Sequence, residues 1–156
     1  MRFHRNIASF WGVGYFPVAP GTAGAFVGAI LFYLLHWGFI ALEIDQAFSI
    51  ASSLLLIIVT TLIANRSINK LKSEWEHDAS QIVVDEVVGV WISLLFIPFN
   101  WVYYLIGFGL FRFFDIAKPL GIKKVDKLNS EWSVMLDDIL AGVYANICFQ
   151  LYFIIF

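Results

Sequence analysis

The stretch at residues 87–111 reads VVGVWISLLFIPFNWVYYLIGFGLF and contains no Asp, Glu, Lys or Arg. A helix that crosses the hydrocarbon core of a bilayer needs about 20 apolar residues, with a range of about 17–25. Pro98-Phe99-Asn100 interrupts the stretch with a turn signal. The pattern therefore predicts two membrane helices joined by a tight turn, at about residues 83–97 and 101–117.

Three other stretches also lack these four residue types: residues 6–42, 46–65 and 139–156. In the first, Pro17, Pro20 and Gly21 break any helix that starts earlier than about residue 22. The stretches predict membrane spans at about residues 22–42, 47–64 and 134–156. Their length, and the absence of short alternating segments, favour helices over barrel strands. The expected fold class is all-α: a polytopic integral membrane bundle of about five helices, forming a single domain over residues 1–156.

The composition agrees with a chain whose solvent is mostly lipid. Apolar residues make up 60% of it, against about 45–50% in average proteins, and charged residues 14%, against about 25%. The mean hydropathy is +0.80. These values exclude a disordered chain, a coiled coil and an ordinary soluble enzyme. The net charge of −2 and the absence of a basic tract argue against nucleic acid as a partner.

The basic residues predict an orientation. With five crossings, all 10 Lys and Arg residues fall on the side of the membrane that holds the N-terminus. The positive-inside rule then places the N-terminus in the cytoplasm and the C-terminus outside.

Four polar clusters lie at predicted helix ends, all on that cytoplasmic side. They are residues 17–24 (PVAPGTAG), Asp85-Glu86 with Gly89, residues 112–119 (RFFDIAKP) and Asp137-Asp138. Ionisable groups at membrane depth are costly, so by default they mark a functional site.

Each cluster also has a purely structural interpretation. Thr22 can be a helix N-cap, and acidic residues in a first helical turn complement the helix dipole. Arg112, Asp115 and Lys118 are spaced to form ion pairs along one helix. Taken together, however, the clusters offer a helix start for an anion, two carboxylate pairs for a hard cation such as Mg²⁺, and an Arg clamp. These are the parts for phosphate chemistry. Which acid of each pair binds metal stays open.

The chain resembles the phosphatidylglycerophosphatase A family in four motifs that occur in the family's order. The motifs are Gly14 through Pro17 and Pro20-Gly21-Thr22 to Gly24, then residues 85–91 (DEVVGVW), then residues 111–115 (FRFFD) with Lys118-Pro119, and finally residues 135–143 (MLDDILAGV). The chain departs from the family at Ala25, where a serine is usual, and in the bulkier segment at residues 129–133.

The resemblance implies a Mg²⁺-dependent lipid phosphatase of the bacterial cytoplasmic (inner) membrane, with its active site facing the cytoplasm. Its substrate would be phosphatidylglycerophosphate, whose terminal phosphate is hydrolysed to give phosphatidylglycerol in phospholipid biosynthesis. The expected partners are this lipid phosphate and the membrane, and the oligomeric state stays open.

The motifs carry the following expectations for the site. The candidate catalytic residues are Asp85, Glu86, Asp115, Asp137 and Asp138. The candidate phosphate-binding residues are Gly21, Thr22, Gly24, Arg112 and Lys118. The candidate metal ligands are Asp85, Glu86, Asp137 and Asp138. The alternative function is a small transporter or channel that uses intramembrane carboxylates, which would need polar groups near the bilayer midplane.

Overall fold

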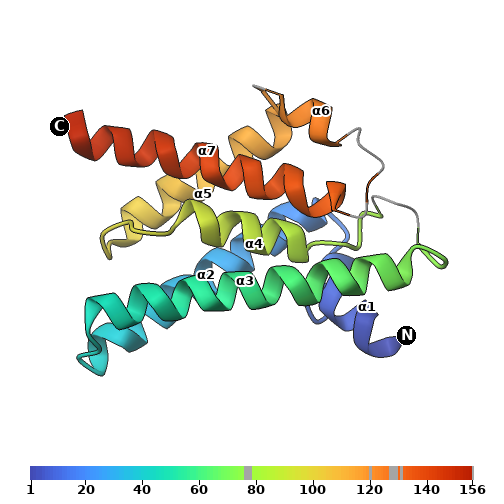
Figure 1. Ribbon diagram of the computed structural model, residues 1–156, viewed down its shortest axis with the longest axis horizontal. Coiled ribbons are helices and arrows are strands. Elements are labelled where there is room, and N and C mark those ends of the chain that lie inside the picture. Colours follow the sequence, from blue (N-terminus) through green and yellow to red (C-terminus); the bar gives the residue numbers. More distant parts are fainter. Residues whose placement is uncertain (76–78, 120, 127–129, 131, 156) are drawn as a thin grey trace.

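The computed structural model describes residues 1–75, 79–119, 121–126, 130 and 132–155. These residues form seven α-helices and one short 3₁₀ helix, with no strand among them (Figure 1). The elements are α1 (Arg2–Ala8), the 3₁₀ helix η1 (Val13–Tyr15), α2 (Pro20–Ala41), α3 (Gln46–Leu71), α4 (Val84–Ser93), α5 (Trp101–Ala117), α6 (Ile122–Asp126) and α7 (Ser133–Ile155). Of these helices, α2, α3 and α7 are long and apolar enough to cross a membrane. The chain is an all-helical membrane protein, as the sequence predicted.

The five longer helices alternate in direction along the bundle. Figure 1 shows α2, α3, α4, α5 and α7 running back and forth, so that the N-terminus and the C-terminus lie at opposite ends. The prediction of about five helices describes this set but omits α1 and α6. These two helices have seven and five residues, which is too short for a helical period to stand out in the sequence.

Helix α3 extends beyond the span predicted at residues 47–64. It continues to Leu71, and its last turns carry Arg66 and Lys70, whose positive charge is favourable at a helix C-terminus. The extension packs against α1, where His4 Nδ1 lies 3.1 Å from the buried hydroxyl of Ser67.

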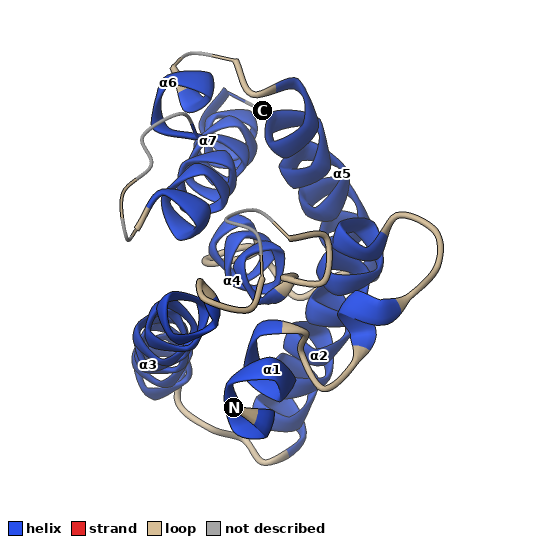
Figure 2. Cartoon of the chain, turned by 90° about the vertical axis from the view of Figure 1, so that its right-hand side faces the viewer, coloured by secondary structure: helices blue, strands red, loops and turns tan. Residues whose placement is uncertain are grey.

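Helix α4 occupies the centre of the bundle. Figure 2, which looks along the bundle, shows it enclosed by α2, α3, α5 and α7, and it contacts all four. Two glycines let α4 and α7 approach closely, because a β-carbon at Gly142 would collide with the carbonyl oxygen of Gly89. On the other side, Trp91 Nε1 donates a hydrogen bond of 2.8 Å to the carbonyl of Gly28 in α2. These contacts fix the depth and the rotation of α4.

Helix α4 is shorter than the predicted span at residues 83–97. It ends at Ser93, so its ten residues rise only about 15 Å, and the following segment turns through a left-handed Phe96. The amide of Asn146, on α7, stabilises this helix end by donating hydrogen bonds to its carbonyls. Its Nδ2 lies 3.2 Å from the carbonyls of Ile92 and Ser93 and 2.7 Å from that of Leu95. A side chain from a neighbouring helix thus satisfies carbonyls that a continuous helix would have bonded itself.

Candidate active site

The four polar clusters converge at one end of the bundle. They occupy the start of α2, the start of α4, the last turn and C-cap of α5, and the start of α7, which meet at the end where α1 lies (Figure 1). The antiparallel order of the helices explains the convergence, because α5 ends at the level where α2, α4 and α7 begin.

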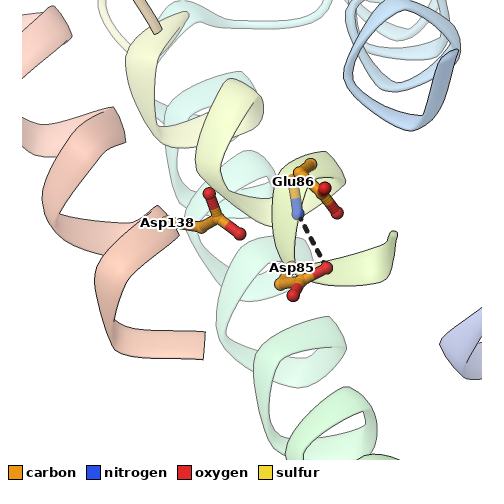
Figure 3. A group of neighbouring side chains, drawn as sticks. All are labelled: Asp85, Glu86 and Asp138. Atoms are coloured by element: carbon orange, nitrogen blue, oxygen red, sulfur yellow. Dashed lines mark hydrogen bonds between the residues drawn. The ribbon is translucent and has the colours of Figure 1, made fainter. Parts of the chain in front are cut away.

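Three carboxylates form the centre of the site. Asp85 and Glu86 from α4 and Asp138 from α7 each offer an oxygen, and these oxygens lie within 4.8 Å of one another (Figure 3). Asp85 and Asp138 are only 4% and 5% exposed. The backbone N–H of Glu86 donates to Asp85 Oδ1 at 3.1 Å, which holds the Asp85 side chain over the helix start. The close glycine contact between α4 and α7 brings Asp138 to the same place.

Two oxygens of this cluster lack a hydrogen-bond partner among the described residues. Glu86 Oε2 and Asp138 Oδ1 are buried and have no hydrogen-bond partner in the described part of the chain. Buried carboxylates that lie together repel one another unless protons or a cation neutralise them. A donor set made only of carboxylate oxygens is typical for Mg²⁺ and similar hard cations. The three residues therefore fit a divalent cation of this kind.

Arg112, in the last turns of α5, lies beside the carboxylate cluster. Its guanidinium forms an ion pair with Asp115 on the same helix, and its Nη2 donates a hydrogen bond of 3.1 Å to Thr22 Oγ1 at the start of α2. Its Nε is buried and, within the described residues, unpaired. Gly21 brings the start of α2 against this group, since a β-carbon there would lie 3.7 Å from Arg112 Nη1. One planar cation therefore joins α5 to α2 and still has a donor available.

Comparison with known proteins agrees with this arrangement. The family model described as Phosphatidylglycerophosphatase A matches residues 6–153. The chain belongs to the phosphatidylglycerophosphatase A family. As a member of this family, it is a phosphatase that acts on phosphoric monoesters.

Three curated relatives cover most of the chain. Proteins named phosphatidylglycerophosphatase A from Haemophilus influenzae and Escherichia coli are 38% and 33% identical, over 90% and 88% of this chain and 83% and 76% of their own lengths. A Bacteroides thetaiotaomicron protein named "Putative phosphatidylinositol-3-phosphatase" is 44% identical, over 90% of this chain and 87% of its own length. No solved structure matches the chain.

The structure separates the two acids of the second family pair. Asp138 joins the carboxylate cluster, whereas Asp137 Oδ2 accepts a hydrogen bond of 2.7 Å from Lys118 Nζ at the end of α5. The group of carboxylates within 4.8 Å of one another does not include Asp137, so the described residues favour a bridge between α5 and α7 for it. Its assignment as a metal ligand stays a prediction.

The remaining phosphate-binding candidates of the family motifs differ in position. Gly24 is buried and packs against the segment before α4, where a β-carbon would lie 2.7 Å from Val83 Cβ. Lys118 caps α5 in the left-handed conformation, with φ 44°. Both residues support the walls of the site, and a direct contact with phosphate stays a prediction for each.

Two features of the site have no clear sign in the charge pattern of this sequence. One is the Gly89–Gly142 contact, and the other is the Asn146 cap of α4. Gly89 and Gly142 lie inside the family motifs, so the motifs marked them without giving a reason. Asn146 lies outside the motifs, and its one sequence signal is an amide side chain within the uncharged stretch at residues 139–156.

Proposed function

We propose that this chain is a Mg²⁺-dependent phosphatase of the bacterial cytoplasmic membrane. It removes the terminal phosphate of phosphatidylglycerophosphate to give phosphatidylglycerol, and its site faces the cytoplasm. The observation that carries the proposal is the juxtaposition of two orphaned carboxylate oxygens, on Glu86 and Asp138, with the guanidinium of Arg112. A bound phosphate is anionic, so it needs positive charge around it. A divalent cation held by the carboxylate cluster would supply this charge on one side, and the guanidinium of Arg112 supplies it on the other.

The residues around the carboxylates have different roles in binding the phosphate. Arg112 retains a donor at Nε, and a planar guanidinium suits the oxygens of a phosphate. Asp115 and Thr22 hold that guanidinium in place, so that it is oriented before substrate arrives. The first turn of α2, at Gly21 and Thr22, adds backbone N–H groups that lack partners within a helix.

The hydrolysis itself requires a nucleophile and a route for protons. Water attacks phosphorus, the bond to the glycerol oxygen breaks, and the glycerol oxygen leaves with the electron pair and takes up a proton. In the proposed reaction, a carboxylate oxygen of the cluster accepts the proton of the attacking water, as general bases do. Mg²⁺ held by Asp85, Glu86 and Asp138 would supply stabilisation of the charge that develops on the phosphoryl oxygens.

The basic residues support the proposed orientation of the site. The described Lys and Arg residues gather at the end of the bundle that holds the site: Arg2 and Arg5 on α1, Arg66 and Lys70 on the last turns of α3, Lys72 after it, and Arg112, Lys118, Lys123 and Lys124 on and after α5. The positive-inside rule supports a cytoplasmic location for this end.

The test is phosphate release by purified protein from a panel of lipid phosphates. The panel contains phosphatidylglycerophosphate, phosphatidylinositol 3-phosphate and phosphatidic acid, each assayed with Mg²⁺ and with excess chelator. We expect the highest kcat/KM for phosphatidylglycerophosphate, and no turnover without a divalent cation. A higher kcat/KM for the inositol lipid would shift the substrate assignment to the one in the name of the Bacteroides relative. Full activity in the presence of excess chelator would refute the requirement for a divalent cation.

A further inference from the structure

A groove between α2 and α5 runs toward the site along the outer surface of the bundle. It has a volume of about 240 Å³ and a lining of apolar and aromatic side chains. Ile30 on α2 and Leu105 on α5 form its rims and are 43% and 51% exposed, while Ala29 at its floor is 9% exposed. Since α2 is long and apolar enough to cross a membrane, the open side of the groove faces lipid.

The groove lies in line with the Arg112 site, because α2 and α5 each carry a residue of the site and residues of the groove on the same face. Thr22 and Arg112 join α2 to α5 by a hydrogen bond of 3.1 Å. One helical turn further from this bond, Phe26 and Phe108 meet edge to face, with ring centroids 6.0 Å apart, and both rings line the groove. Residues four apart lie on one face of a helix, so the polar contact, the aromatic pair and the groove follow one another along a single seam.

We propose that this groove binds an acyl chain of the lipid phosphate whose headgroup lies at Arg112. The inference rests on the proposed function. A membrane lipid has an anionic head at the interface and chains that point into the bilayer, and the seam presents a cation at the end of the bundle and apolar walls deeper in. The residues from Thr22 to Ala29 rise about 10 Å along α2, which leaves space for the glycerol-phosphate-glycerol linkage between the terminal phosphate and the chains.

A second apolar groove offers an alternative site for the acyl chain. It has a volume of about 350 Å³ and lies between α1, α2, α3 and α4, with Leu31 and Leu56 in its lining. Of the helices that form it, only α2 also carries a partner of Arg112, and it does so on the face that turns toward α5. An acyl chain in this second groove would therefore lie on the face of α2 opposite the contact between Thr22 and Arg112.

The experiment compares long-chain and short-chain phosphatidylglycerophosphate, both presented in the same detergent micelles. For the parent protein we expect kcat/KM to be about tenfold or more higher for the long-chain lipid, since each buried methylene adds to the binding free energy. Ala29→Phe fills the floor of the groove, and Leu105→Trp narrows its rim. Both should remove most of the long-chain preference while the short-chain kcat/KM stays within about twofold, a barrier change of about 0.4 kcal/mol.

Two variants of α2 provide the controls. Leu34→Trp changes a lipid-exposed residue that lines neither groove and should keep the preference, whereas Leu31→Trp fills the second groove. Loss of the preference in Leu31→Trp but not in Ala29→Phe or Leu105→Trp would assign the chain to the second groove and overturn the proposal. A parent protein that hydrolyses neither lipid would instead refute the proposed function.

A readout independent of turnover completes the test. A long-chain lipid phosphate with a diazirine near the end of one chain is photolysed with the parent protein, and the adducts are located by mass spectrometry. We expect adducts on the peptides that carry Ile30 and Leu105, and their loss in Ala29→Phe. Adducts confined to α3, at Leu56 and its neighbours, would overturn the assignment even if Ala29→Phe proved unstable.

Discussion

Gly21 lies directly against the carboxylate of Glu86, so that a β-carbon at position 21 would collide with Glu86 Oε1. The start of α2 and the start of α4 can meet this closely only because residue 21 has no side chain. The contact places the free N–H groups of α2 beside a carboxylate of the cluster. Arg112 lies at the same point, since the same β-carbon would lie 3.7 Å from its Nη1 and its Nη2 donates a hydrogen bond to Thr22.

Gly21→Ala should therefore disturb the site while leaving the fold intact. The atom in the way is the end of a flexible side chain, so Glu86 can move aside, but its carboxylate then leaves the cluster. We expect phosphate release to fall by about tenfold or more, because misplacing a positioned group by about 1 Å can cost up to 10²-fold. Gly38→Ala, on the same helix with open space around it, is the matched control and should keep the parent rate.

Arg112→Lys distinguishes two roles for Arg112: binding the phosphate, or only forming an ion pair with Asp115 within α5. The guanidinium binds Asp115 and Thr22 at once, and an ammonium on a flexible stem does not reproduce this planar fork. We expect the rate at saturating lipid and Mg²⁺ to fall by about 10²–10³-fold, as when one preorganised donor to a transition state is removed. A rate within about twofold of the parent, or about 0.4 kcal/mol in barrier height, would leave Arg112 a structural residue.

Removal of single carboxylates should divide the acids into two groups. Glu86→Ala and Asp138→Ala remove members of the cluster, so we expect both to abolish turnover and to lose Mn²⁺ binding, followed as a stand-in for Mg²⁺ by electron paramagnetic resonance. Asp137→Ala breaks the bridge to Lys118 and should retain metal binding. Glu43→Ala, an exposed acid at the opposite end, is the control. Normal metal binding in both cluster variants would return these acids to a helix-dipole role.

The membrane orientation can be tested with tags. A reporter at the N-terminus and another after α3, near Lys72, should be found in the cytoplasm, and one at the C-terminus should be found outside. The reason is the collection of basic residues at the end of the bundle that holds the site. A cytoplasmic C-terminus would mean that one of the five alternating segments does not cross the membrane.

The sequence predicted the features that depend on residues close together in the chain, but not those that depend on contacts between helices. Uncharged stretches located α2, α5 and α7 to within a few residues, and clustered ionisable residues located the end that carries the site. The early end of α4 could not be predicted, because residues 87–97 contain no charged residue and no proline that would mark it, and the cap comes from Asn146, about 50 residues later. The separation of Asp137 from Asp138 depends likewise on Lys118, which approaches only after α5 and α7 have packed.

Asn146→Leu tests whether this cap holds the centre of the bundle together. Leucine is close to asparagine in size but donates no hydrogen bond, so the carbonyls of Ile92, Ser93 and Leu95 would lose a shared donor. An unsatisfied buried polar group costs about 1–3 kcal/mol, and we expect a loss of about this size in the free energy of unfolding, measured by denaturation in detergent micelles. Ile147→Leu, at the adjacent lipid-facing position, should change it by less than about 0.5 kcal/mol. Equal stability of Asn146→Leu and the parent would show that water or detergent satisfies these carbonyls, and that the break in α4 does not depend on α7.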